Sequence, residues 1–513
     1  MLEYGWQIFC LSLVLSTLFN YTLRYFAPTL GLFDQADGHR RLTAGVIPRA
    51  GGLAIFIGLT GATISLLIWS GMAKSRFLDN PLSFLVLASA SFGITLLGFL
   101  DDRFNLRGRN KFLGQFLIVL ILVYFGNYRV ERIQLFNMDF DLGPLEIPFA
   151  IFWFMGAINA ANLLDGMDGL LASVGLVASV GMGGIAFIHG QILPCYISMM
   201  LAGSLLGFLY FNRPPASIYL GDAGSMLIGL LLAAISLKIH DLSNDKSWVM
   251  AIPLAVLVLP IIDTSAAILR RKLTGRSIYS TDHGHLHHCL QREGFGRKGS
   301  LFIVISLSAI AVGSAFISNL FNIELFAWGG IGLVGLILVQ AGWFGRPEIR
   351  LLFKRLRNFL RISPRQKSVR GFSNEGILLH GNDFWHTVWK RVVNYAKEHK
   401  YIYVDLNINA PAFHESYHAQ WTNSSTKSKE EADQTASFQH PIFVDDNCVG
   451  RLGIVMGKGN WDKRGDLGHL VKLVDIVEES ARYILINPNG NAAEVVEKNV
   501  SCDIGATEYP RIR

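Results

Sequence analysis

Charged side chains are scarce in this chain of 513 residues. Asp, Glu, Lys and Arg make up 17% of it, whereas hydrophobic residues make up 51%. A soluble protein of this length needs a larger charged surface, so the composition excludes an ordinary soluble protein and indicates a membrane protein. The five cysteines show no metal-ligand spacing and do not suggest a disulfide framework. The first apolar run lacks a basic n-region and a small-residue cleavage site, and it follows Glu3, which favours a retained helix over a signal peptide.

Apolar segments of roughly the length that spans a bilayer, ~20 residues, recur along the first two thirds of the chain. They predict about eleven transmembrane helices, at residues 6–28, 51–71, 81–100, 112–126, 148–164, 169–190, 192–211, 223–239, 248–269, 300–319 and 324–343. Lys and Arg are concentrated in one set of alternating connections, which predicts that these connections are cytoplasmic. The sequence therefore predicts an all-α polytopic membrane protein with its N-terminus outside, its C-terminus inside and its polar motifs on the cytoplasmic side.

The most informative stretch runs from Asn159 to Leu170 and places Asn159, Asn162, Asp165 and Asp168 in steps of three. On a helix that spacing gathers side chains along one slowly drifting face. Amides and carboxylates at the end of an apolar helix are costly unless they face a polar cavity, a cation or a phosphate. A helix-ending Asx-Gly turn is the alternative, but two Asp-Gly pairs after two spaced asparagines favour a binding site.

Two adjacent carboxylates, Asp101 and Asp102, follow another apolar run. They repel each other at the unfavourable end of a helix dipole, so they need a compensating cation, either a divalent metal or Lys111. An ordinary charged stop at the membrane interface is the alternative. In the loop before the second span, His39, Arg40, Arg41 and Arg49 form a candidate anion-binding set, and anchoring by positive charge at the cytoplasmic face is the alternative for the arginines. The Gly51-Gly52 pair after it favours a close backbone approach to a bound group.

Asp222 lies on a small-residue turn at the start of a later span, where it could cap the helix or face a phosphate. A connection rich in histidine follows, with His283, His285, His287 and His288. Taken alone it would suggest zinc, but beside carboxylate clusters on the same side, contacts to a diphosphate or nucleoside are favoured. Hard oxygen ligands also favour magnesium over zinc for the carboxylates.

Four motifs, in this order between these spans, resemble the polyprenyl-phosphate N-acetylhexosamine-1-phosphate transferases of glycosyltransferase family 4: Asp101-Asp102, Asn159 to Leu170, Gly221 to Ser225 and His285 to His288. The His-Leu-His-His form is most similar to the bacterial undecaprenyl-phosphate N-acetylglucosaminyl-1-phosphate transferase branch. The related phospho-N-acetylmuramoyl-pentapeptide transferases share the carboxylate motifs, but their histidine segment differs. The resemblance covers roughly residues 1–345. Ala36, Thr43 and His283 depart from it, standing where similar proteins often have Pro, His and Arg.

The resemblance implies transfer of a sugar 1-phosphate from a UDP-N-acetylhexosamine to a polyprenyl phosphate, with release of UMP. It implies Mg²⁺ or Mn²⁺ at Asp222 with Asp102 near it, because the attacked phosphorus already carries negative charge. Asp101 would orient the acceptor phosphate or take its last proton. The residues implied to bind nucleotide and diphosphate are Asn159, Asn162, Asp165, Asp168, Arg276, His285, His287 and His288.

Two other classes compete with this interpretation. A secondary transporter would place its polar residues near mid-membrane in repeated halves, whereas here they cluster at one set of helix ends. A membrane-anchored signalling protein would work through its tail. The formal charge of +7 suits anionic inner-leaflet lipid and anionic substrates better than nucleic acid. A homodimer, and a regulatory ligand or protein on the C-terminal domain, are left open.

The sequence divides into a transmembrane transferase domain at 1–344, a basic amphipathic linker at 345–370, a cytoplasmic α+β domain at 371–488 and a disordered tail at 489–513. In the α+β domain the pattern predicts helices near 383–399 and 466–485, strands at 401–407, 441–444 and 451–455, and a polar loop at 423–435. The order faintly resembles GAF-type sensor domains, and no catalytic constellation stands out in it.

Overall fold

The computed structural model describes residues 2–26, 47–71, 74–75, 80–136, 138–239, 247–273, 284–345, 349, 377–380, 384–410, 415–423, 435–444, 447–457 and 464–486. The chain forms two compact units, Met1–Ile268 with His285–Phe344 and Leu269–Gly284 with Gly345–Arg513. The predicted linker at 345–370 and tail at 489–513 lie almost wholly outside the described residues.

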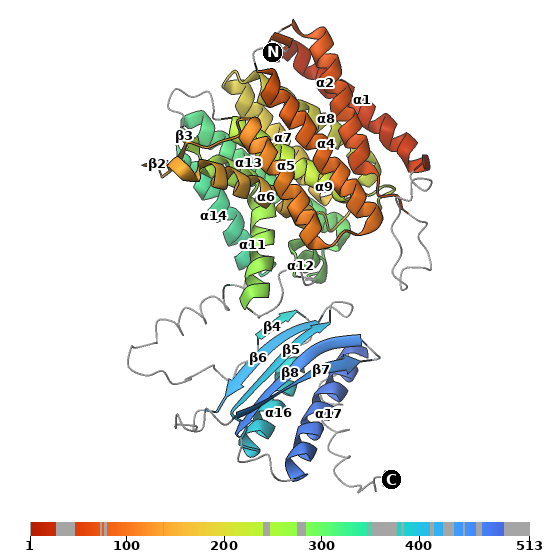
Figure 1. Cartoon of the computed structure of the whole chain (residues 1–513), viewed down its shortest axis with the longest axis vertical. Helices are drawn as coiled ribbons and strands as arrows, with labels where there is room; N and C mark the ends of the chain where they lie inside the picture. Colours follow the sequence, from red (N-terminus) through yellow and green to blue (C-terminus); the bar gives the residue numbers. More distant parts are fainter. Residues whose placement is uncertain are drawn as a thin grey trace. The chain divides into compact units, whose positions relative to one another are not determined.

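The part of the chain before residue 345 is mainly helical, as the apolar runs predict (Figure 1). Its helices are α1 (Leu2–Phe26), α2 (Gly51–Trp69), α4 (Pro81–Phe104), α5 (Gly108–Phe125), η1 (Gly143–Leu145), α6 (Glu146–Leu164), α7 (Leu170–Ile188), α8 (Ile192–Asn212), α9 (Gly221–Lys238), α10 (Ala251–Val256), α11 (Val258–Leu273), α12 (Leu286–Arg292), α13 (Gly296–Phe321) and α14 (Glu324–Gln340).

Among the described residues, nine helices are long and apolar enough to cross a membrane, which makes the chain a polytopic membrane protein. α14 is a shorter apolar helix. The segment predicted as one span at 248–269 is divided between α10 and α11 at Leu257. Pro260 explains the division, because it has no N–H to donate to the carbonyl of Val256 four residues earlier and its ring crowds that carbonyl.

The prediction of an all-α membrane part is wrong in one detail, a small sheet of order β2-β1-β3. β1 (Arg132–Leu135) and β2 (Met138–Asp141) pair in an antiparallel arrangement. β3 (Ser247–Val249) joins β1 in parallel, more than a hundred residues further along the chain. Trp248 anchors it, because its buried indole N–H donates to Ser236 O of α9 at 2.9 Å.

α9 is the central helix of this unit, because 83% of the residues in its most apolar stretch are buried inside the protein, compared with 22% in the corresponding stretch of α5. Glycines allow its neighbours to approach. A Cβ on Gly52 of α2 would overlap the backbone of Gly224, and a Cβ on Gly98 of α4 would overlap the backbone of Ala223. The structure therefore shows a close backbone approach at the Gly51-Gly52 pair, and the neighbour it shows is the backbone of α9.

The C-terminal part is an α+β fold, as predicted. Its five-stranded sheet has the order β4-β6-β5-β8-β7, and every neighbouring pair is antiparallel. The strands are β4 (Ile377–His380), β5 (Tyr403–Ala410), β6 (Glu415–Thr422), β7 (Thr435–Val444) and β8 (Asn447–Gly457), and the helices are α16 (Phe384–Glu398) and α17 (Arg464–Ile486).

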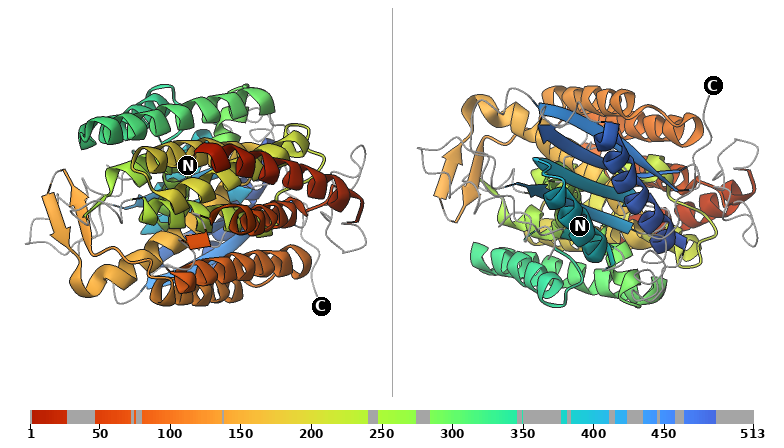
Figure 2. Two further views of the ribbon diagram at one scale, coloured as in Figure 1. Left: turned by 90° about the horizontal axis from the view of Figure 1, so that it is seen from above. Right: turned by 90° about the horizontal axis from the view of Figure 1, so that it is seen from below.

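One face of this sheet carries the core of the unit. Residues of β5 alternate between buried and half-buried, so one side of the strand faces the core. α16 and α17 pack side by side across that side (Figure 2), and Trp385, Trp389 and Tyr417 are its largest fully buried side chains. Both predicted helices and all three predicted strands are confirmed, whereas β4 and β6 were not predicted. Most of the predicted polar loop lies outside the described residues, and the likeness to GAF-type domains stays a prediction.

Candidate active site

A cavity of about 410 Å³ opens where several membrane helices end. It is lined by carboxylates, amides, imidazoles and guanidinium groups from five separate stretches of the chain. The polar side chains among the lining residues are Arg49, Asp102, Asn162, Asp165, Asp168, Asn212, Tyr219, Asp222, His287, His288, Gln291 and Arg297. Such a concentration of polar groups against an apolar bundle is costly to maintain and indicates a binding site.

Asp102, near the end of α4, holds the start of α9. Its Oδ1 accepts from the backbone N–H of Asp222 at 3.0 Å, and its Oδ2 accepts from that of Ala223 at 3.2 Å. A carboxylate is favourable here because the first N–H groups of a helix have no partner within the helix. Asp222 itself makes no capping hydrogen bond, and the N-cap position is Leu220. The interpretation of Asp222 as an N-cap is therefore wrong, and its carboxylate is available to the cavity.

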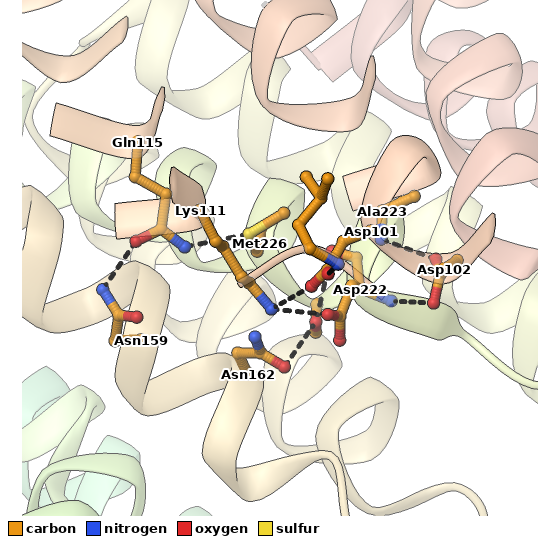
Figure 3. Close-up of polar contacts among 11 residues, drawn as sticks. Asp101, Asp102, Lys111, Gln115, Asn159, Asn162, Asp222, Ala223 and Met226 are labelled. Carbon is orange, nitrogen blue, oxygen red and sulfur yellow. Dashed lines mark hydrogen bonds and ion pairs between the residues drawn. The ribbon is translucent and has the colours of Figure 1, made fainter. Parts of the chain in front are cut away.

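Lys111 at the start of α5 supplies a cation to Asp101, the first of the two adjacent carboxylates, and to Asp222 (Figure 3). Its Nζ lies 2.8 Å from Asp101 Oδ2 and also contacts Asp222 Oδ2. The second oxygen of Asp101 accepts from Leu106 N at 2.8 Å, which fixes the turn between α4 and α5. Of the two cations considered from the sequence, the structure shows Lys111 in contact with Asp101.

Asn162 lies between Lys111 and Asp222 in the same close-up (Figure 3). If its amide is flipped from the orientation drawn, its nitrogen donates to Asp222 Oδ1 at 3.1 Å and its oxygen accepts from Lys111 Nζ at 2.7 Å. Asn159, one turn earlier on α6, turns away from the cavity and donates to Gln115 Oε1 at 3.0 Å and Met155 O at 2.8 Å. The equal spacing therefore places only one of the two asparagines at the site.

The turn between α6 and α7 brings Asp165 and Asp168 to the cavity. α6 ends at Leu164, so the helical spacing stops before Asp165. Asp168 Oδ2 accepts from Ala216 N at 3.1 Å and lies 3.8 Å from Arg297 Nη1. Protein surrounds Asp165 closely although part of its surface faces the cavity, and this burial, reinforced by the charges of Asp222, Asp102 and Asp168, raises its pKa to about 8.

Arg49 reaches the cavity because the backbone before α2 pairs with the segment before α9. Tyr219 N donates to Pro48 O at 2.8 Å, Gly51 N donates to Tyr219 O at 3.0 Å, and Gly52 N donates to Leu220 O at 2.9 Å. These bonds fix Arg49 at the edge of the cavity, where its positive charge acts on Asp102. The other members of the predicted anion-binding set, residues 39–41, lie outside the described residues.

The histidine segment forms another wall. His287 and His288 line the cavity with ring centroids 4.1 Å apart. A Cβ on Gly166 would overlap the His287 ring, so the Asp165–Gly166 turn and this histidine pack tightly. His285 is buried and is not among the lining residues, because its Nδ1 lies 2.8 Å from Asp263 Oδ2 of α11. Arg276 and His283 fall outside the described residues.

The structure thus brings Asp102, Asn162, Asp165, Asp168, Asp222, His287 and His288 together at one cavity. Asp101 is not among the lining residues but contacts Lys111, which in turn contacts Asp222 of the cavity. Asn159 and His285 form hydrogen bonds with other parts of the protein. Sequence reasoning missed Arg297, Gln291 and Asn212 as site residues. Asn212 could have been predicted as a site residue because, like Asn162, it lies at the end of an apolar run. In the structure its Oδ1 accepts a hydrogen bond from Gly169 N at 2.8 Å, which supports the turn beside Asp168.

The donor set fits a hard divalent cation. Asp102, Asp165, Asp168 and Asp222 face the cavity, and the pKa of Asp165 is raised by burial and then by the negative charges of Asp222, Asp102 and Asp168, which a cation would offset. Within the described part of the chain, no three carboxylate, imidazole or thiol side chains are already arranged as a complete ligand set. A cation held by one or two carboxylates, with substrate oxygens and water completing its shell, matches the usual coordination of Mg²⁺.

Comparison with known proteins decides the family. Residues 84–240 match the sequence family described as glycosyl transferase family 4. The probable undecaprenyl-phosphate N-acetylglucosaminyl 1-phosphate transferase of Bacillus subtilis is 31% identical over 316 residues, which cover 60% of this chain and 85% of that protein. The chain belongs to glycosyl transferase family 4.

Other relatives of this family 4 chain differ in the group that their names say they transfer. The decaprenyl-phosphate N-acetylglucosaminephosphotransferase of Mycobacterium tuberculosis is 33% identical over 293 residues, covering 52% of this chain and 71% of the relative. The phospho-N-acetylmuramoyl-pentapeptide-transferase of Enterococcus hirae is 33% identical over 252 residues, covering 47% and 74%. The family match includes Asp101, Asp102, the 159–168 stretch and Asp222, but it ends before the histidine segment.

Proposed function

We propose that this protein transfers N-acetylglucosamine 1-phosphate from UDP-N-acetylglucosamine to a polyprenyl phosphate, releasing UMP and forming a lipid-linked diphosphate sugar that begins cell-envelope polysaccharide assembly. The observation that carries the proposal is the cavity itself. Carboxylates gather on one side and imidazoles and arginines on another, all at the ends of membrane helices, where a soluble nucleotide sugar and a lipid phosphate can meet. The names of the relatives support the same chemistry.

In the proposed reaction an oxygen of the lipid phosphate attacks the sugar-bearing phosphorus of the donor. The bond from that phosphorus to the bridging oxygen breaks, and the bridging oxygen leaves with UMP. The attacking phosphate is already an anion at neutral pH, so the protein needs mainly to align the two phosphates and balance their charge. A direct displacement satisfies these needs without a covalent enzyme intermediate.

Each group of residues has a part in this alignment. Lys111, held between Asp101 and Asp222, places a positive charge beside the phosphates. Asp101 would orient the acceptor phosphate, and Asn162, Asp165, Asp168, His287 and His288 would bind the nucleotide and diphosphate, with Arg276 as a further proposed contact. Arg49 and Arg297 add cations at the rim. Mg²⁺ or Mn²⁺ held by Asp222, with Asp102 beside it, would supply charge neutralisation at the diphosphate.

The donor can be tested by the product. Purified full-length protein with undecaprenyl phosphate and Mg²⁺ should release UMP from UDP-N-acetylglucosamine, and a lipid diphosphate sugar should be seen by mass spectrometry. UDP-N-acetylgalactosamine and UDP-N-acetylmuramoyl-pentapeptide are the comparison donors, because identity alone does not separate the two kinds of relative. Faster turnover of the pentapeptide donor would overturn the choice of sugar. Release of UDP, which marks transfer of a sugar without its phosphate, would overturn the reaction.

We further propose eleven membrane crossings in a plasma or inner membrane, with the N-terminus outside and the cavity at the cytoplasmic side. The nine long helices, α14 and the α10–α11 pair supply the eleven. Single cysteines placed at Asn105, Asn137 and Ser280 in a cysteine-free chain test the arrangement. Labelling from the cytoplasm alone is expected at 105 and 280, and from outside alone at 137. If 137 and 280 react from the same face, the number of crossings is wrong.

A further inference from the structure

Asp263 on α11 is a buried carboxylate that none of the steps above uses. Only 1% of its surface is exposed, so an ionised carboxylate there needs hydrogen-bond partners to offset the loss of water. It has two, on consecutive residues of the histidine segment. Oδ2 lies 2.8 Å from Nδ1 of His285, and Oδ1 accepts from the backbone N–H of Leu286 at 2.8 Å. Both oxygens therefore hold the point where α12 begins.

This pair fixes the orientation of the His285 ring. A carboxylate can only accept, so Nδ1 of His285 carries the proton that the two groups share. A histidine held in this way keeps one ring orientation and one tautomer, which is how buried carboxylates commonly prepare functional imidazoles. A simple satisfied core pair is the competing explanation, and it predicts no effect on the cavity beyond loss of stability.

The arrangement of the rings connects this pair to the cavity. The His285 and His287 rings are nearly parallel, 12° apart, with centroids 6.2 Å apart. His287 in turn packs against Gly166 and His288 at the cavity wall. A shift of the segment at His285 would therefore move the two imidazoles that face the cavity, although Asp263 is not among the residues that line it.

We propose that Asp263 is a positioning residue, which acts through His285 to hold His287 and His288 against the nucleotide and diphosphate of the donor. The inference rests on the proposed function, because it assumes that these imidazoles bind the donor. It assigns Asp263 to donor affinity and not to the chemical step, since the carboxylate cluster with Lys111 is held by α4, α5 and α9 and needs no contact from α11.

Asp263→Asn in the full-length protein isolates the contact to His285. Its remaining oxygen can still accept from Leu286 N, but an amide NH₂ replaces the oxygen that faced the imidazole. We expect the KM for UDP-N-acetylglucosamine to rise on the order of 10- to 100-fold, as for outer partners of functional histidines, with kcat changed by less than about threefold. Asp263→Glu, which restores a carboxylate, should recover part of the loss.

Two comparisons separate positioning from general stability. Glu324→Gln is the control, because Glu324 is another buried carboxylate of the membrane unit and is not among the residues that line the cavity. It accepts hydrogen bonds from Phe136 N at 2.8 Å and from Trp328 Nε1 at 3.4 Å. This variant should leave the KM for UDP-N-acetylglucosamine unchanged. In a His285→Ala background, Asp263→Asn should change KM by less than about twofold, because the partner through which it acts is already gone. An equal loss in both backgrounds would show that Asp263 serves the fold alone and would overturn the proposal.

A readout without turnover keeps the two proposals distinguishable. Diethyl pyrocarbonate modification, followed by peptide mass spectrometry, should proceed faster at His285 in Asp263→Asn than in the unaltered protein. If the unaltered protein turns over no UDP-sugar, the proposed function fails while the labelling still tests the contact. If the protein is active and Asp263→Asn leaves both KM and the labelling rate unchanged, the inference about Asp263 fails.

Discussion

Asp102 and Asp222 are neighbours in space with different tasks. Each carboxylate oxygen of Asp102 accepts a hydrogen bond from a backbone N–H group at the start of α9, and these two bonds fix Asp222 next to Asp102. Asp222 faces Lys111, Asn162 and the cavity. The structure therefore makes Asp222 the stronger candidate for direct contact with a cation or phosphate, and makes Asp102 the residue that orients Asp222.

Replacing Asp222 by Asn tests this assignment. The amide keeps the shape but removes a hard anionic ligand, so we expect a loss of roughly a thousandfold or more in rate, equivalent to ~4 kcal/mol of transition-state stabilisation. Asp139→Asn, on the exposed strand β2, is the matched carboxylate control and should retain full activity. UMP release is measured with Mg²⁺, with Mn²⁺ and with EDTA. Persistence of activity in EDTA, or an active Asp222→Asn, would contradict the metal assignment.

The raised pKa of Asp165, about 8, predicts a pH dependence of cation binding. Below that pH the carboxyl is mostly protonated in the folded protein, whereas the same carboxyl in an unfolded chain ionises at a pH of about 4. Its contribution to stability is therefore lost as the pH rises from about 4 to about 8. A divalent cation favours the ionised form. Binding of Mg²⁺ should therefore release a proton and strengthen as the pH rises from about 6 to about 8.

Calorimetry in two buffers of different ionisation enthalpy measures that proton directly. The observed binding enthalpy should depend on the buffer near pH 7 and lose that dependence well above pH 8. Asp165→Asn has no proton to release at this position and should reduce the buffer dependence at pH 7. Equal enthalpies in both buffers for the unaltered protein would show that Asp165 is already ionised.

At the scale of residues, the sequence predicted the cavity carboxylates but not all of their neighbours. The carboxylates could be found because each follows or begins an apolar run, where an ionised side chain is costly unless it faces a polar cavity or a charged partner. Asn159 and His285 were misplaced because their partners, Gln115 and Asp263, lie on other helices, and nothing in the local pattern shows which way a side chain turns once the helices pack. Arg297 was not predicted as a site residue for the same reason, because its position at the cavity depends on how the helices pack.

At the scale of elements, the contact between α4 and α9 decides the geometry of the site. Gly98 lies against the backbone of Ala223, one residue after Asp222. The contact keeps the end of α4 close enough for Asp102 to reach the first N–H groups of α9. The sequence showed a glycine before Asp101-Asp102 but not which helix it meets, because hydropathy gives the spans and not their neighbours.

Gly98→Ala should therefore separate the two helices. Its Cβ has no space against the backbone of Ala223, so we expect a loss of about 1–3 kcal/mol in stability together with most of the activity. Gly93→Ala on the same helix is the matched control, because its Cβ would meet the side chain of Ile118 at ordinary contact distances, 3.4 Å from Cδ1, 3.5 Å from Cγ1 and 3.9 Å from Cγ2. Thermal unfolding in detergent and UMP release are measured for both. If the two variants behave alike, the close approach at Gly98 does not position the site.

The division at Leu257 is another feature of elements that hydropathy misses. An apolar run of ordinary span length appeared as one helix, although it contains Pro260. The proline rule was sufficient to predict a break there. The break makes α11 a separate helix that begins at Val258, and Asp263 on this helix contacts the histidine segment. That contact could be seen only in the structure.

At the scale of the whole molecule, the chain contains two hydrophobic cores that share no residue. One joins the membrane helices, and the other joins α16, α17 and the C-terminal sheet. The sequence predicted this division from the change in composition and from the basic stretch after Gly345. It predicted the helices and three of the strands of the C-terminal part, whereas β4 is short and β6 was missed although Ser416, His418 and Gln420 alternate regularly with the buried Tyr417, Ala419 and Trp421.

All cavity residues lie before residue 300, so we expect the C-terminal part to control the transferase and not to complete it. A chain ending at Gly345 should release UMP at the full-length rate per folded molecule, since it keeps every residue that lines the cavity. The matched control is full-length protein with a protease site inserted after Gly345, assayed before and after cleavage, which compares the same molecules with and without a continuous chain. Gel filtration and thermal unfolding show whether the truncated protein is folded. A well-folded, inactive truncation would mean that residues after Gly345 complete the active site, and the separation of catalysis from control would be wrong.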